Sequence, residues 1–193
     1  MLYGENDFCL QRQHNTRGNF YDSEWKEVGY KDVRRFFEMI GPINISLIRT
    51  VKIDFDDGTP SASPGSTVEQ RRFLNDGHLL HALKLLGKHG ELDYIKMGFY
   101  GRRYMYMSDK KFLNVLRAIK ANKVEFGHAR CQESPGRSDV SYFRVSSNWP
   151  GKIGSVIMVD LKEHMLRDPL TDKEVAELLK WRPNKNPGTL WYE

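Results

Sequence analysis

The chain has 193 residues, of which 39% are hydrophobic and 28% charged, and its formal net charge at pH 7 is +5. A chain of this length buries roughly 70% of the surface that it exposes when unfolded, so stability requires neither disulfides nor a metal. Two cysteines and no long apolar run exclude a disulfide scaffold and a membrane-spanning protein. We expect unpaired thiols and an intracellular protein, in the cytoplasm or nucleus, because the N-terminal residues also lack a secretory signal pattern.

A helix followed by a strand recurs three times with similar apolar spacing, and a strand over residues 3–10 precedes the first unit. The first helix is predicted over residues 31–40, where apolar side chains form one face. Gly41 and Pro42 are predicted to end it. The following strand, residues 47–55, alternates enough apolar side chains to be buried on at least one face.

The second unit begins after a polar segment rich in Gly, Pro and Ser. Thr67 with Gln70, or Ser66 with Glu69, has capping-box spacing, which predicts a helix to about Leu74, interrupted before a longer helix. That longer helix is predicted to end at Gly87. The alternation that follows predicts a strand over residues 92–99.

The third unit is predicted to begin at Ser108, a helix cap, and its helix to end at Asn122. Its strand is predicted over residues 124–128. The chain from 131 to 154 lacks periodicity, apart from a short strand predicted at 142–145.

The C-terminal part contains a last buried strand at 156–161 and one further helix. The helix is predicted from a capping box formed by Thr171 and Glu174, and it must end before Pro183.

Helices alternating with short strands predict an α/β fold with a mostly parallel sheet. If every crossover places its helix on the same side, a curved sheet similar to that of leucine-rich repeats results, with its other face open. A doubly wound sheet is the alternative. We expect one domain over residues 1–183 with a mobile loop at 56–66, followed by a tail at 184–193.

Three segments carry a resemblance to a known group of proteins. They are residues 2–8, 36–41 and 48–53, which read LYGENDF, FFEMIG and IRTVKI. Together they resemble uncharacterised filamentous-fungal proteins with an LYxxNxF segment, some of which are similar to F-box-associated proteins. The resemblance covers mainly residues 2–55 and implies a fold more than a function. It implies that Asn6 is a turn residue and Phe8 a core residue.

Positive charge concentrates between Lys84 and Arg130, where eleven basic and four acidic residues give a net charge of +7. Two arginines lie next to two tyrosines in part of this segment, a combination that can neutralise phosphates and stack on bases. The candidate nucleic-acid-binding residues are Lys96, Arg102, Arg103, Tyr104, Tyr106, Lys110 and Lys111. A solvated surface is the alternative interpretation.

Signals for chemistry are sparse. Three histidines have spacing compatible with a metal on one helix, but no HExxH or paired CxxC motif accompanies them. Three carboxylates follow the first unit's strand, where they can hold a cation or simply form a turn. These residues are His78, His81 and His89, and Asp54, Asp56 and Asp57. We predict no catalytic residue, no metal and no cofactor.

The pattern as a whole favours a non-enzymatic protein-interaction module, which presents its sheet face or its basic loop to a protein partner. The alternative is a protein that binds nucleic acid or another polyanion through residues 84–130.

Overall fold

The sheet has four parallel strands whose order in space follows their order in the chain. The computed structural model describes residues 4–12, 29–58, 65–127 and 150–181. The strands are β1 (Asp7–Leu10), β2 (Thr50–Phe55), β3 (Leu92–Phe99) and β4 (Ala121–Phe126). Ile53 lies opposite Met97, and Met97 lies opposite Phe126. The predicted α/β class and parallel pairing of the three units are therefore confirmed.

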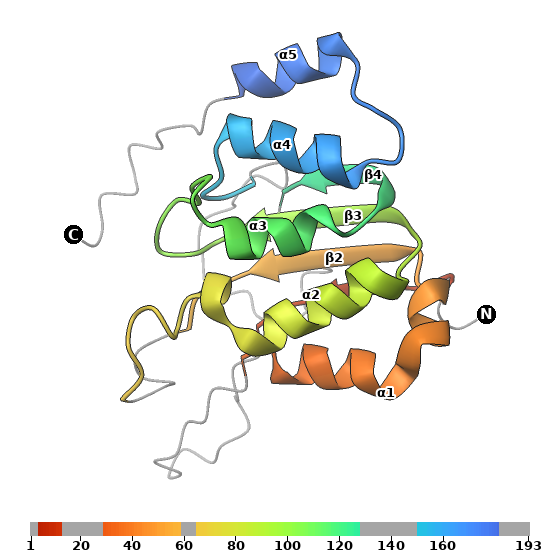
Figure 1. The fold of residues 1–193 in the computed structure, drawn as a ribbon, viewed down its shortest axis with the longest axis vertical. Helices are drawn as coiled ribbons and strands as arrows, with labels where there is room; N and C mark the ends of the chain where they lie inside the picture. Colours follow the sequence, from red (N-terminus) through yellow and green to blue (C-terminus); the bar gives the residue numbers. More distant parts are fainter. Residues whose placement is uncertain (1–3, 13–28, 59–64, 128–149, 182–193) are drawn as a thin grey trace, which may run out of the picture.

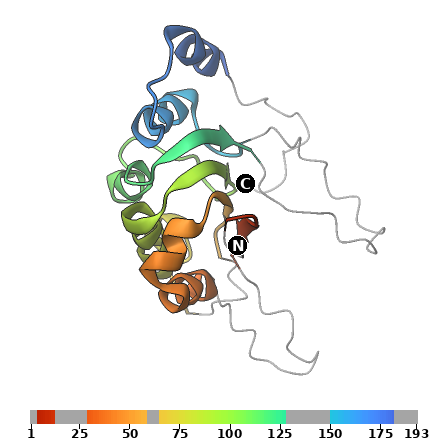
Figure 2. The same ribbon diagram turned by 90° about the vertical axis from the view of Figure 1, so that its right-hand side faces the viewer.

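All five described helices lie on one face of this sheet (Figures 1 and 2). They are α1 (Lys31–Leu47), α2 (Gly77–His89), α3 (Lys110–Arg117), α4 (Ser155–Met165) and α5 (Asp172–Lys180). Each helix contacts the next in a single row. Neighbouring parallel strands joined by crossovers of one hand place every helix on the same side, which accounts for the arrangement.

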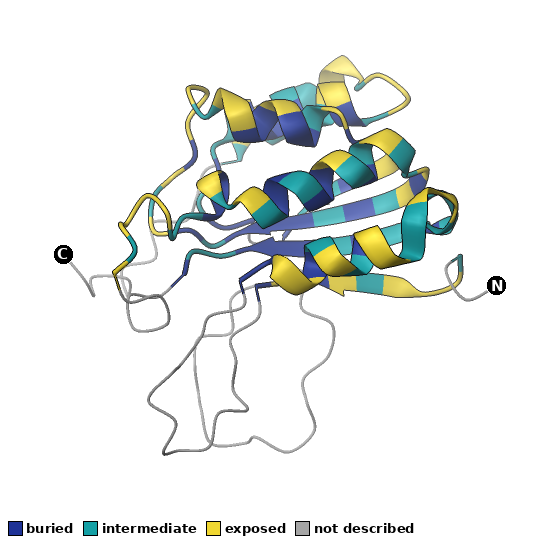
Figure 3. Cartoon of the chain, turned by 60° about the horizontal axis from the view of Figure 1, so that its bottom comes forward, coloured by how far each residue is buried: buried dark blue, intermediate teal, exposed yellow. Residues whose placement is uncertain are grey.

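The core lies between this helix layer and the sheet, with the buried faces turned toward each other (Figure 3). Its centre is Phe55 in β2, which is fully buried. The Phe55 ring lies 5.6 Å from that of Phe73, 5.0 Å from Phe99 and 5.2 Å from Phe112, measured between centroids. These rings join the 3₁₀ turn Phe73–Asn75, β3 and α3 to the middle of the sheet.

The first helix extends beyond its predicted end. Gly41 adopts φ +72°, a kink after which helical residues resume as far as Leu47. Proline is well tolerated in the first turn of a helix, so Pro42 begins the second helical segment instead of ending the helix. In consequence β2 begins at Thr50, three residues later than predicted.

The capping box at Thr67 forms without a helix behind it. The Thr67 amide donates to Gln70 Oε1 at 2.8 Å, and the Gln70 amide donates to Thr67 Oγ1 at 3.2 Å. Extended backbone at Arg72, with ψ 136°, then stops helical winding. Between Thr67 and the start of α2 the chain forms only turns and the short 3₁₀ helix. The prediction of a helix to Leu74 is therefore wrong.

The ends of the next two helices also differ from prediction. The longer helix continues past Gly87 to His89, and Gly87 instead allows close approach to α3, since a Cβ there would lie 3.3 Å from the Ala118 carbonyl. The N-cap of α3 is Asp109, not Ser108, and Asn122 lies inside β4.

The last predicted strand, residues 156–161, is wrong because this segment belongs to α4. The helix contacts α3, α5 and β4, so its buried side chains are nearly continuous along the sequence. A short apolar run with β-branched residues does not distinguish a strand from a buried helix. The following helix, α5, is confirmed, including both hydrogen bonds of its capping box. The strand predicted at 142–145 lies outside the described residues.

Beyond β4, a second segment pairs with β3. The Phe99 amide donates to the Pro150 carbonyl at 2.9 Å, and the Lys152 amide donates to the Phe99 carbonyl at 2.7 Å. Gly151 lies between them at φ +86°. A Cβ on Gly151 would lie 1.9 Å from the Phe99 carbonyl oxygen, so only glycine fits this position.

Cys9 in β1 is disulfide-bonded, so the prediction of unpaired thiols is wrong for this residue. Cysteine number alone does not reveal whether two thiols approach each other in space. Within the described residues, no helix is both long and apolar enough to cross a membrane.

Asp76 connects the start of α2 to Arg12, in the segment that follows β1. Its Oδ1 accepts the amides of His78 at 2.9 Å and Leu79 at 3.0 Å, and its Oδ2 lies 3.4 Å from the Arg12 guanidinium. We expect Asp76→Ala to lower the free energy of unfolding by about 2–3 kcal/mol, because it removes a helix cap and a partner of a buried cation.

Urea denaturation of Asp76→Ala and Asp76→Asn measures this effect. Asparagine retains a capping oxygen, so the loss should be about half as large. Equal losses in both variants would contradict the capping role of Asp76.

Candidate functional site

The strands turn polar side chains away from the helices. Side chains alternate along a strand, and those at Val51, Ile53, Ile95, Met97 and Val124 belong to the buried core. The intervening side chains therefore project from the opposite side of the sheet. No described helix covers this side, and we call its charged and aromatic side chains that are not fully buried the open face: Asp7, Lys52, Tyr94, Lys96, Lys123 and Glu125.

Strand register arranges most of the open face in two parallel rows. In the first row Tyr94 of β3 pairs with Lys123 of β4. In the second row Lys52, Lys96 and Glu125 occupy successive strands at the same level. The pairing of the strands therefore brings together residues that are far apart in the sequence.

Direct contacts link these rows. Lys52 forms an ion pair with Asp7. The Tyr94 hydroxyl donates to Glu125 Oε2 at 2.7 Å, and Lys123 Nζ lies 2.7 Å from Glu125 Oε1. Lys123 Nζ also lies 5.4 Å from the centre of the Tyr94 ring. The polar side chains thus hold one another in place and form an ordered surface.

Protonation supports this network at neutral pH. Burial, and then its hydrogen bond to Glu125, raise the pKa of the Tyr94 hydroxyl above its usual value. Hydrogen bonds from Lys123 and Tyr94 lower the pKa of the Glu125 carboxyl. Tyr94 therefore remains a donor and Glu125 a charged acceptor.

Lys96 differs from its charged neighbours on the open face. In the part of the chain that the structure describes, its ammonium has no carboxylate within ion-pair distance, while Lys52 pairs with Asp7 and Glu125 pairs with Lys123. Its register partner on β2 is Lys52, another cation. On its other side Lys96 lies opposite Glu125 of β4, whose carboxylate is ion-paired with Lys123. Because like charges directly opposite each other destabilise a sheet, a further carboxylate between Lys96 and Lys52 would be favourable.

The second candidate surface lies beyond the carboxyl end of β3. We call residues Gly101–Asp109 the tyrosine loop, and α3 follows it directly. The loop and the first turn of α3 together contain six of the seven predicted nucleic-acid-binding residues: Arg102, Arg103, Tyr104, Tyr106, Lys110 and Lys111. The seventh, Lys96, is separate, since it lies within β3 on the open face, roughly 20 Å along the chain from Arg102.

The predicted carboxylates lie at the end of β2, and Asp57 binds the backbone of two other segments. Asp57 accepts the Phe73 amide at 3.0 Å through one oxygen and the Arg102 amide at 2.6 Å through the other. Asp54 is buried, with its carboxylate above Gly98 of β3. The bonds of Asp57 therefore connect the end of β2 to the 3₁₀ turn and to the tyrosine loop.

The predicted histidines lie on α2, and one of them contacts α1. His81 Nε2 is 3.3 Å from Glu38 Oε1, which also accepts from Arg34 Nε at 2.7 Å. Among the described residues, no three His, Cys, Asp or Glu side chains are placed to hold a metal ion. His81 therefore contributes to the packing of α1 against α2.

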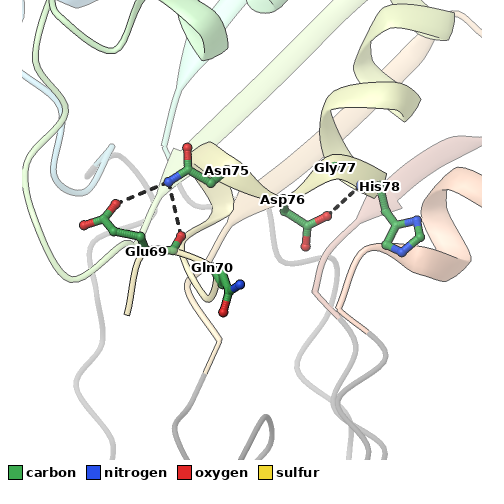
Figure 4. A pocket seen from close by; sticks show the side chains of 6 residues that line it. All are labelled: Glu69, Gln70, Asn75, Asp76, Gly77 and His78. Carbon is green, nitrogen blue, oxygen red and sulfur yellow. Dashed lines mark hydrogen bonds between the residues drawn. The ribbon is translucent and has the colours of Figure 1, made fainter. Parts of the chain in front are cut away.

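A shallow depression lies between the segment before α2 and the start of that helix (Figure 4). Several of its polar groups bond to each other, whereas the buried His78 Nδ1 has no hydrogen-bond partner among the described residues. Asn75 Nδ2 donates to the Glu69 carbonyl at 3.2 Å and lies 3.3 Å from Glu69 Oε2, while Asp76 caps α2. These contacts stabilise the segment before α2 and the start of that helix.

Sequence reasoning identified the tyrosine loop but not the composition of the open face. The signal was present as a polar residue at every second position, with Lys52 before Asp54, Tyr94 before Lys96, and Lys123 before Glu125. Comparison with protein-family models, curated proteins and solved structures finds no match to this chain. Function is therefore inferred from the geometry of these surfaces.

Proposed function

We propose that this protein is a non-enzymatic interaction module that binds a partner polypeptide through the open face. The observation that carries this proposal is the placement of all described helices on one side of a parallel sheet (Figure 2). Parallel sheets are normally covered on both faces by apolar packing. A polar, internally bonded face on such a sheet is well suited to recognition by another protein.

The repeated helix and strand units suggest the architecture behind this function. We propose a curved sheet similar to that of leucine-rich repeats, in which each unit adds one strand to the recognition face. After α4, Leu166 forms a parallel bridge with Ala121 of β4. This bridge continues the succession of helix and parallel strand beyond β4. The resemblance of residues 2–55 to the filamentous-fungal group remains part of this proposal, and Phe8 does pack against the core, 5.6 Å from Phe36.

The expected partner carries carboxylates. Lys96 sits between Lys52 and Glu125 in one row, and its ammonium forms no ion pair within the described residues. A partner carboxylate placed beside Lys96 would compensate its charge and separate it from Lys52. Tyr94, in the adjacent row, offers an aromatic surface next to the same position.

Selection from a random peptide-display library tests this proposal, followed by calorimetric titration of an enriched peptide. We expect enriched peptides to contain Asp or Glu, and Lys96→Glu to weaken binding at least about tenfold because it adds a like charge at the contact. The matched control is Lys84→Glu, the same charge change on an exposed position of α2. That control should bind within about twofold of the unmodified protein, because surface charges far from a contact are largely screened.

Two outcomes would contradict the proposal. One is a selection that enriches no acidic peptide. The other is equal weakening by Lys96→Glu and Lys84→Glu, which would indicate nonspecific attraction to overall positive charge.

A further inference from the structure

The tyrosine loop exposes three large side chains around one buried methionine. Tyr104 is 44% exposed, Tyr106 56% and Met107 43%, whereas Met105 between the tyrosines is only 4% exposed. The Met105 amide also donates to the Lys152 carbonyl at 3.0 Å. Burial of Met105 therefore anchors the loop and turns both tyrosine rings outward.

Ionic contacts hold the loop in this conformation. The Arg103 guanidinium makes two hydrogen bonds to the Asp109 carboxylate, at 2.9 and 2.6 Å, and its carbon lies 5.3 Å from the Tyr106 ring centre. The same carboxylate accepts the Tyr106 amide at 2.9 Å. At the other end, the Arg102 amide is fixed by Asp57. The exposed rings are therefore ordered before any partner arrives, which reduces the entropic cost of binding.

Exposed cations adjoin the rings. Lys110 and Lys111 form the first turn of α3, which contains no acidic residue, and both are exposed. Positive side chains are unfavourable at a helix N-terminus because the helix dipole is also positive there. Arg102 precedes the tyrosines in the sequence and is exposed, and its guanidinium donates to the Gly58 carbonyl. Positively charged side chains therefore adjoin the tyrosines in the sequence, and the charges of Lys110 and Lys111 do not stabilise α3.

We propose that the tyrosine loop binds single-stranded nucleic acid. The rings of Tyr104 and Tyr106 would stack on unpaired bases, and Lys110 and Lys111 would contact the phosphates. Exposed aromatic rings beside a basic surface are the combination by which proteins bind single strands with little sequence preference. Paired bases in a duplex do not offer their faces for stacking, so single strands are favoured over duplexes. This surface is separate from the open face, and the proposal does not depend on the proposed protein interaction.

Fluorescence anisotropy with a labelled oligothymidine of about 12 nucleotides tests the proposal, since a site of this kind covers about 4–16 nucleotides. Changing both tyrosines to alanine (Tyr104→Ala with Tyr106→Ala) should weaken binding at least about tenfold. The matched variant with both changed to phenylalanine retains the rings and should bind within about threefold of the unmodified protein.

The electrostatic part of the proposal has its own readout. Lys110→Gln with Lys111→Gln should reduce the slope of log affinity against log salt by about 1.4, because two phosphate contacts are lost on a single strand. Lys84→Gln on α2 should leave the slope unchanged. Circular dichroism and the urea midpoint should show that every variant is folded.

Three results would overturn the proposal. They are the absence of saturable binding, alanine variants that bind as tightly as the unmodified protein, and equal affinity for single strands, a duplex of the same length and heparin. The last result would show attraction to any polyanion instead of stacking on bases.

Discussion

Replacing Gly151 with alanine is expected to lower the free energy of unfolding by about 3 kcal/mol or more. Gly151 has φ +86°, and a Cβ there would lie 1.9 Å from the Phe99 carbonyl oxygen. The backbone of β3 cannot move away without losing the hydrogen bonds that pair Phe99 with Pro150 and Lys152. Urea denaturation followed by circular dichroism measures the change.

Gly65 provides a matched control for this substitution. It has a similar φ of +81°, but a Cβ there would meet nothing within 4 Å. Gly65→Ala should therefore lower the free energy of unfolding only through the strain of a positive φ at alanine, by about 1 kcal/mol. If the two alanine variants were equally stable, the close approach of Gly151 to β3 would be refuted.

Phe55→Ala is expected to produce the second large effect, a loss of about 3–5 kcal/mol of unfolding free energy. Phe55 is fully buried, and its ring contacts aromatic rings from three other parts of the chain. Truncation leaves a cavity between the sheet and α3 that rigid neighbours cannot fill. Thermal unfolding and urea denaturation both report this loss.

The control for the Phe55 variant is Phe36→Ala. Phe36 is only half-buried on α1 and contacts the rings of Phe8 and Phe37 at the edge of the core. Its truncation should cost about half as much as that of Phe55, because solvent can fill part of the space. A larger loss at Phe36 would mean that the core is centred near β1 instead of β2.

The repeated units could be predicted because their apolar spacing repeats. Each helix presents apolar side chains to the sheet, and each strand has buried residues at alternate positions, so type and order were readable for β2, β3 and β4. The α4 segment could not be read in this way. It is buried against two helices and a strand, and its two valines and one isoleucine are equally typical of a strand.

Local signals were less reliable where contacts from distant residues decide the outcome. Thr67 and Gln70 form the predicted capping box, yet a helix does not follow. Asp109 replaces Ser108 as the N-cap of α3, and its carboxylate binds Arg103 instead of capping the helix through its side chain. Propensity therefore indicated where the chain turns, but not which structure follows.

The candidate surfaces differ in how far sequence could reveal them. The arginines and tyrosines from Arg102 to Tyr106 are close in the sequence, so their combination was visible directly. The open face depends on register, which places Lys52, Lys96 and Glu125 side by side from three strands. A single sequence shows alternation within a strand, but it does not show which residues on different strands become neighbours.

A map of amide chemical-shift changes during titration with the selected acidic peptide tests the central claim most directly. If the open face is the binding surface, the largest changes will fall on Lys52, on residues 94–96 and on residues 123–125. Changes concentrated on α1 and α2, with these strand residues unaffected, would show that the partner binds the helix layer and would contradict the claim.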